Sequence, residues 1–139
     1  MSFDPASEGW SPWPPSGFSG FTGPLWSRAE GDGWAYGVLA DERHANNHGI
    51  VHGGMLVTLL DNTLGITVHR ATGKRPGVTM QLNTQFLSAA HPGEFLEGRG
   101  EVLRLARSVA FVRGTVSVGG RLVAAGDGVW KLLAAPPAA

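Results

Sequence analysis

The strongest constraint on the fold is an apolar run in the middle of the chain, residues 53–68, whose only ionisable side chain is Asp61. The run contains no proline and no strict alternation, so it predicts a buried helix rather than a strand. At ~1.5 Å per residue such a helix spans roughly 25 Å, about the width of a small domain. We therefore expect one helix through the middle of the fold, with a single carboxylate part-way along it.

The stretches on both sides of this helix have the pattern of β-strands. Gly31-Asp32-Gly33 is a hairpin turn signal, and side chains alternate along residues 109–118, as in a sheet with one covered face. The pattern predicts an α+β fold, an antiparallel sheet of about five to six strands wrapped around one long central helix. The expected strands are residues 25–30, 33–40, 78–87, 94–105, 108–118 and 121–133.

The length of 139 residues suits one domain with a hydrophobic core and is too short for two. We place this domain at residues 25–133, followed by a flexible tail at residues 134–139. Residues 1–24 form a leader rich in proline and aromatic residues. In one interpretation, the leader only packs over the surface of the domain. In the other, it forms one wall of a ligand cleft or part of a subunit contact, since Trp and Phe bring large apolar area.

Composition excludes several classes of protein. Basic and acidic residues number 11 each, so no net charge attracts nucleic acid or an anionic membrane. Cysteine is absent, which excludes disulfides, thiolate nucleophiles and cysteine-based zinc sites. The N-terminus lacks the basic and apolar regions of a signal peptide, and Asp61 interrupts the longest apolar run, which argues against a membrane span. We expect a cytoplasmic protein.

Asp61 is the first candidate for chemistry. A carboxylate among apolar side chains loses water and becomes a stronger base unless hydrogen-bond donors compensate, and such groups are often functional. The alternative is that Asp61 lies on a solvated stripe with Thr58, Asn62 and His69. The residues alone leave these two interpretations nearly balanced.

The stretch His52-Gly53-Gly54 directly precedes the predicted helix. Glycines there leave backbone N–H groups open to a ligand, and with the helix dipole these groups make a site for an anion or a developing oxyanion. A tight loop-to-helix entry explains the same glycines equally well.

Metal binding and the common hydrolase motifs are disfavoured. His44, His48 and His52 have a spacing that would align three imidazoles on a helix, but Asn46 and Gly49 between them disfavour that helix. Neither Cys nor Glu is placed to complete a site, so we expect no metal. The sequence also lacks a G-x-S-x-G elbow, a P-loop and an H-E-x-x-H pair.

The order of these residues resembles a known family. Asn46, Gly49, His52-Gly53-Gly54 and then Asp61, nine residues after the histidine, are similar to the motif of hotdog-fold acyl-CoA thioesterases of the PaaI (phenylacetate-degradation) type. Residues 76–83 resemble the strand that follows the helix in that family. The likeness extends over the whole predicted domain, and the hotdog architecture agrees with the predicted sheet and helix.

The resemblance implies a hydrolase of acyl-CoA thioesters and a role for each motif residue. Asp61 is the nucleophile or the general base that activates water, and the Gly53 N–H binds the thioester carbonyl oxygen. Asn46 positions water or the thioester from the opposite subunit. His52 lies beside the oxyanion site, and Thr79 holds the attacking water or Asp61.

The resemblance also implies binding partners. The substrate is an acyl-CoA, with no cofactor, and the chain associates with itself as a homodimer or homotetramer that shares active sites. Two other functions stay open, a hotdog hydratase or dehydratase of acyl thioesters and a non-catalytic acyl-CoA binding module. The residues expected to bind substrate or CoA are Gly54, Lys74, Arg107 and Ser108.

Overall fold

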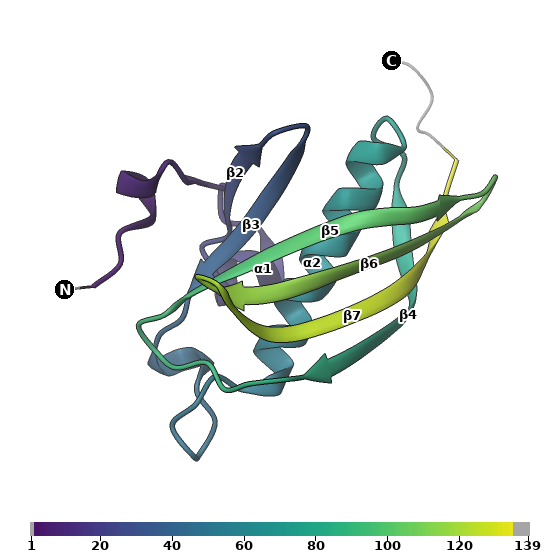
Figure 1. The fold of residues 1–139 in the computed structure, drawn as a ribbon. Helices are drawn as coiled ribbons and strands as arrows, with labels where there is room; N and C mark the ends of the chain where they lie inside the picture. The colour runs from purple at the N-terminus through teal and green to yellow at the C-terminus, as the bar shows by residue number, and fades with distance from the viewer. Residues whose placement is uncertain (1, 135–139) are drawn as a thin grey trace.

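The structure is a computed structural model that describes residues 2–134. Its strands form one sheet in the order β1-β2-β3-β5-β6-β7-β4, and every neighbouring pair is antiparallel. The long helix α2 (Gly53–Ala71) packs against one face of the curved sheet (Figure 1). The strands are β1 (Ser11–Pro12), β2 (Trp26–Glu30), β3 (Gly33–Leu39), β4 (Gly77–Phe86), β5 (Phe95–Leu105), β6 (Val109–Val118) and β7 (Arg121–Leu132).

Close packing of α2 on the sheet creates the core. Leu59, Leu60 and Leu64 point from the helix into this core and have no exposed surface. Opposite them the sheet carries glycine: a Cβ added to Gly98 on β5 would lie only 2.1 Å from the Thr63 hydroxyl. Interiors are packed at crystal-like density. The glycine therefore lets the helix lie closer to β5 than any larger residue would permit.

Both ends of α2 have identifiable caps. His52 is the N-cap, and its Nδ1 accepts a hydrogen bond from the Gly54 N–H at 2.7 Å. Thr72 is the C-cap, and the following Gly73 has φ +67°, a conformation that glycine adopts without strain. The apolar run ends at Val68, but the helix extends three residues further, to Ala71. Its last turn is polar and still makes the backbone hydrogen bonds of a helix.

The predicted fold class is confirmed. Each of the six expected strands is present, with both ends within one residue of the expected positions. The seventh strand is β1, which is two residues long and pairs with β2. It was not predicted, because two residues are too few to show a strand pattern in the sequence. The predicted tail falls largely at residues 135–139, outside the described residues. Within the described residues, no helix is long and apolar enough to cross a membrane.

The leader wraps around the β1–β2 side of the sheet (Figure 1). Trp10 is buried in a small cluster with Phe95, and their ring centroids lie 4.8 Å apart. Trp13, three residues later, packs edge-to-face against Tyr36 of the main core at 6.2 Å. The leader therefore covers apolar surface on both sides of the sheet. Its short helices are η1 (Pro5–Glu8) and α1 (Gly17–Thr22).

The opposite edge of the sheet is uncovered. Among residues 2–134, strand β4 is the last in the order and pairs with β7 alone. Most of its side chains are exposed, including the apolar Val78 and Met80, 49% and 61% exposed. Ten residues of unpaired strand edge with exposed apolar side chains is a template for pairing with another chain.

Candidate active site

Asp61 and Thr79 meet across the gap between α2 and β4. The Thr79 hydroxyl donates a hydrogen bond to Asp61 Oδ1 at 2.7 Å. Asp61 is half-buried and opens onto a pocket of about 360 Å³ that Trp130 also lines. The sequence left two alternatives for this carboxylate, a solvated stripe and an apolar pocket. In the structure, Asp61 has both a hydrogen-bond donor, Thr79, and an apolar wall that includes Trp130.

A β-bulge explains how Thr79 reaches Asp61. Thr79 pairs with Trp130, but Gln81 pairs with Val129, so Met80 is an extra residue on β4. Side chains alternate along a regular strand, which would put Thr79 and Gln81 on the same face. The bulge instead lets Thr79 face the helix while Gln81 lines the outer face of the sheet.

The start of α2 offers one free donor. Met55 and Leu56 donate their N–H groups to the carbonyl of His52, and the Gly54 N–H donates to His52 Nδ1. Among the described residues, the Gly53 N–H makes no hydrogen bond. The predicted oxyanion donor is therefore available, whereas the Gly54 N–H is already engaged. Gly54 as a binding residue stays a prediction.

His52 is fixed by the same contacts. Because its Nδ1 accepts from Gly54, the neutral ring carries its proton on Nε2. Its backbone N–H donates to the carbonyl of His44 at 2.7 Å. Residue 52 is exposed and directly precedes Gly53 in the chain.

Gly53 and Asp61 are too far apart to act on one carbonyl group. They lie eight residues apart on α2, which at ~1.5 Å per residue is about 12 Å along the helix axis. An attacking oxygen and an oxyanion donor each need to be roughly 3 Å from the reacting group. The residues of one chain therefore form two half-sites, not one complete site.

Within one chain, Asn46 is apart from the Asp61 half-site and lies on the loop that precedes α2. Its side-chain oxygen accepts from the backbone N–H groups of His48 and Ile50, at 2.9 and 3.3 Å, and shapes its own loop. It does not line the Asp61 pocket. The side-chain amide N–H groups of Asn46 make no hydrogen bond within the described residues and remain available.

The other predicted CoA-binding residues, Lys74, Arg107 and Ser108, lie near the C-terminal end of α2. Arg75 donates to the carbonyl of Arg107 at 3.1 Å, which joins the loop that carries Lys74 to the β5–β6 turn. Ser108 accepts the Leu132 N–H through its carbonyl, at 2.8 Å. Lys74 and Arg107 are exposed on touching segments, but neither lines the Asp61 pocket. Their contact with CoA stays a prediction.

Sequence reasoning missed two aromatic residues, one in the Asp61 pocket and one beside Gly53. Trp130 walls the pocket, and Phe86 lies over Gly53, where an added Cβ would meet its ring at 3.3 Å. Both are strand residues whose type suggests core packing, so no sequence signal separated them from other apolar residues. Asn62 and Ile66 also line the pocket from α2.

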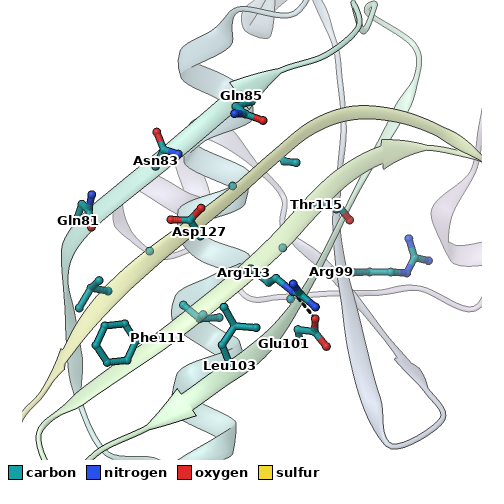
Figure 2. A pocket seen from close by; sticks show the side chains of 17 residues that line it. Gln81, Asn83, Gln85, Arg99, Glu101, Leu103, Phe111, Arg113, Thr115 and Asp127 are labelled. Atoms are coloured by element: carbon teal, nitrogen blue, oxygen red, sulfur yellow. Dashed lines mark hydrogen bonds and ion pairs between the residues drawn. The ribbon is translucent and has the colours of Figure 1, made fainter.

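A larger hollow lies elsewhere. Its volume is about 840 Å³, and it occupies the face of the sheet that α2 leaves open (Figure 2). Figure 2 shows polar side chains along it, with an ion pair between Arg113 and Glu101 at 2.6 Å. Neither Asp61 nor Thr79 lines it. The smaller pocket is therefore the candidate active site, since it contains the helix carboxylate Asp61 with a directed donor, Thr79, on β4.

Comparison with known proteins now identifies the family. The thioesterase superfamily matches residues 48–125, more than half of the chain, including His52, Asp61 and Thr79. The chain belongs to the thioesterase superfamily. The predicted hotdog thioesterase family is thereby confirmed, and with it the general reaction, hydrolysis of a thioester.

Individual relatives agree. Human acyl-coenzyme A thioesterase 13 is 33% identical over 91 residues, which cover 64% of this chain and 65% of that protein. A phenylacetic acid degradation-related protein from Ralstonia eutropha JMP134 is 29% identical, with TM-score 0.75, and 87% of this chain and 92% of that one are covered. The BH2602 protein from Bacillus halodurans, solved with CoA, is 26% identical, with TM-score 0.72 and coverage of 79% and 74%.

Proposed function

We propose that this thioesterase hydrolyses an acyl-CoA to the free acid and CoA. The observation that carries the proposal is the Asp61–Thr79 pair at 2.7 Å, in a pocket at the middle of the helix whose first N–H is free. The relative named acyl-coenzyme A thioesterase 13 and the CoA-bound structure of BH2602 support CoA as the leaving group.

The chemistry needs few groups. A thiolate leaves readily, so a thioester does not need a strong acid to protonate its leaving group. The Asp61 carboxylate either attacks the carbonyl carbon or takes a proton from water that attacks it. The Gly53 N–H then donates to the oxyanion that forms, and loss of one such donor typically lowers the rate by ~10²–10³. Thr79 orients the carboxylate or the water.

Two copies of the chain assemble a complete site in this proposal. About 12 Å separates Gly53 from Asp61 along one helix, so the oxyanion donor beside a given Asp61 comes from a second copy. Asn46 enters with that donor, and its free amide N–H groups bind the thioester or water. The exposed edge of β4, which carries Thr79, supports pairing along this edge. Such pairing gives a homodimer, and two dimers would give the predicted homotetramer.

The direct test is release of free thiol from a panel of acyl-CoA esters. We expect turnover by the wild type and a loss of at least ~10²-fold in kcat for Asp61→Asn, because the amide neither attacks nor takes a proton. Circular dichroism and thermal unfolding check that the variant keeps its fold. Asp127→Asn is the matched control, since it makes the same substitution at an exposed carboxylate that does not line the Asp61 pocket.

The outcomes separate the three functions. Full activity of Asp61→Asn would remove Asp61 from the mechanism. Addition of water to an enoyl-CoA without thiol release would favour the hydratase. Binding of acyl-CoA by the wild type, without turnover of any thioester, would favour the binding module.

A further inference from the structure

A second pocket lies between the leader and α2. Its volume is about 270 Å³. The leader contributes Trp13, Pro15 and Ser19, and the helix contributes Asn62 and Ile66. No charged side chain lines it. An uncharged pocket with proline and indole walls suits an apolar group, because a charge placed there would lose water without a partner.

This leader pocket adjoins the pocket of Asp61, because Asn62 and Ile66 line both. Asn62 is also the chain neighbour of Asp61. A ligand whose reacting carbon lies at Asp61 would reach the leader pocket past these two side chains.

The wall of the pocket is held in place before any ligand binds. Trp13 donates its backbone N–H to the Leu25 carbonyl at 2.8 Å and its indole N–H to the Ser27 hydroxyl at 2.9 Å. The end of α1 is fixed as well, because Arg43 donates to the carbonyls of Phe21 and Gly23 at 2.9 and 2.8 Å. A preorganised wall binds without a large cost for ordering the chain.

We propose that the leader pocket receives the acyl group of the thioester and that Trp13 limits its length. An apolar cavity of about 150 Å³ is enough to bind benzene, so about 270 Å³ accommodates roughly ten carbon atoms on the same scale. The preferred substrates are then uncharged acyl groups of short to medium length, aliphatic or aryl. The proposal rests on the thioesterase function above. It concerns a segment outside residues 48–125, the part matched by the family.

Two variants test the pocket from opposite directions. Ser19→Phe fills it, and Trp13→Ala enlarges it. Phe18→Trp is the control for added bulk, because residue 18 is on the same short helix, 65% exposed and absent from the pocket lining. Trp34→Ala is the control for loss of an indole, because residue 34 is exposed to a similar extent, 38% against 36% for Trp13, and does not line this pocket.

The measurement is kcat/KM for acetyl-, hexanoyl-, benzoyl- and palmitoyl-CoA. We expect Ser19→Phe to lower kcat/KM for hexanoyl- and benzoyl-CoA at least ~10-fold more than for acetyl-CoA. Trp13→Ala should raise kcat/KM for palmitoyl-CoA relative to hexanoyl-CoA by a similar factor. Both controls should keep the wild-type order of substrates. Equal losses for every substrate, or no change in the order, would overturn the proposal, because a purely structural role lowers all rates together.

A binding measurement separates this proposal from the proposed function. Thioether analogues of acetyl-CoA and hexanoyl-CoA cannot be hydrolysed, so calorimetry measures their affinity whether or not the enzyme turns over. We expect the hexanoyl analogue to lose at least ~10-fold in affinity in Ser19→Phe, with a smaller change for the acetyl analogue. Unchanged affinity for both analogues would refute the leader pocket even if Asp61 is catalytic. If neither the wild type nor any variant hydrolyses a thioester, but Ser19→Phe still weakens binding of the hexanoyl analogue, only the proposed hydrolysis is refuted.

Discussion

The hydrogen bond between Thr79 and Asp61 is the clearest functional contact at the scale of single residues. Its donor and acceptor lie 18 positions apart in the sequence and on different elements. A hydroxyl that donates to one oxygen of a carboxylate fixes the direction in which the second oxygen points. We therefore propose that Thr79 is a positioning residue, which acts on the reaction through Asp61 or through the water.

We expect Thr79→Val to lower kcat about 10- to 100-fold with little change in KM, because a hydrogen bond to a charged group contributes ~1.5–3 kcal/mol. Thr79→Ser keeps the hydroxyl and should restore most of the rate, which a merely structural role for the side chain would not produce. Steady-state kinetics on hexanoyl-CoA measures both constants. Equal activity of the Val and Ser variants would contradict the positioning role.

Another residue-scale prediction concerns acid stability. Hydrogen bonds from Arg99, and secondly from Arg28, lower the pKa of Glu30 from its ordinary 4.5 to about 2. A lowered pKa in the folded state stabilises it above pH 4.5, and this contribution is lost as the pH falls towards 2. Glu30→Gln should therefore cost about 1–2 kcal/mol at pH 7, after allowance for solvent screening of a partly exposed pair.

Urea unfolding at several pH values checks this prediction. The stability difference between wild type and Glu30→Gln should shrink as the pH falls from 4.5 towards 2. Glu42→Gln is the control, since residue 42 is exposed and has no ion pair among residues 2–134. A difference that does not depend on pH would show that the substitution acts through packing.

At the scale of elements, the structure depends on how closely α2 approaches the sheet. The glycines of β5, β6 and β7 allow this approach. An added Cβ at Gly114 would lie 2.7 Å from Leu64, and one at Gly126 would lie 2.7 Å from Leu60. The depth of α2 fixes the position of Asp61 relative to β4. The same packing therefore sets both stability and active-site geometry.

Gly98→Ala tests this packing, because its Cβ would overlap the buried Thr63 side chain. We expect a loss of about 3 kcal/mol in the free energy of unfolding, the cost typical of overpacking a core. Gly33→Ala is the matched control, since its Cβ would meet no atom closer than 3.8 Å. Chemical denaturation measures both, and equal stability of the two variants would contradict the close packing of α2 on β5.

At the scale of the whole molecule, the central question is whether two chains share each site. Co-expression of Asp61→Asn with Asn46→Ala, purified through two different tags, gives a mixed dimer. If the site is shared, the intact Asp61 of one chain meets the intact Asn46 of the other. One of the two sites in the purified mixed dimer is then complete, so it should have about half of wild-type activity.

Each single variant alone serves as the control for this experiment. A site built within one chain gives no recovery on mixing, because every chain then lacks either Asp61 or Asn46. Light scattering on the wild type gives the number of chains and separates dimer from tetramer. A monomer with full activity would contradict the shared site.

Much of the fold and part of the site followed from the order of residues. A long apolar run without proline or alternation indicated α2, and strand-like patterns between turn signals indicated six strands. Asp61 was recognisable as the single carboxylate in the apolar run, and Gly53 as a glycine at a helix start. Thr79 and His52 entered through the resemblance to a family, not through their own pattern.

The rest was decided by tertiary structure. The extra residue at Met80 turns Thr79 towards Asp61, and a single bulge leaves no periodic signal in the sequence. Strand β1 and the leader pocket exist because Trp10 and Trp13 pack on opposite sides of the sheet, a contact between segments far apart in the chain. The sequence by itself determined the long helix, six of the strands and the residues that are capable of catalysis. Only packing decided which of those residues meet, because that depends on register, bulges and the depth of the helix.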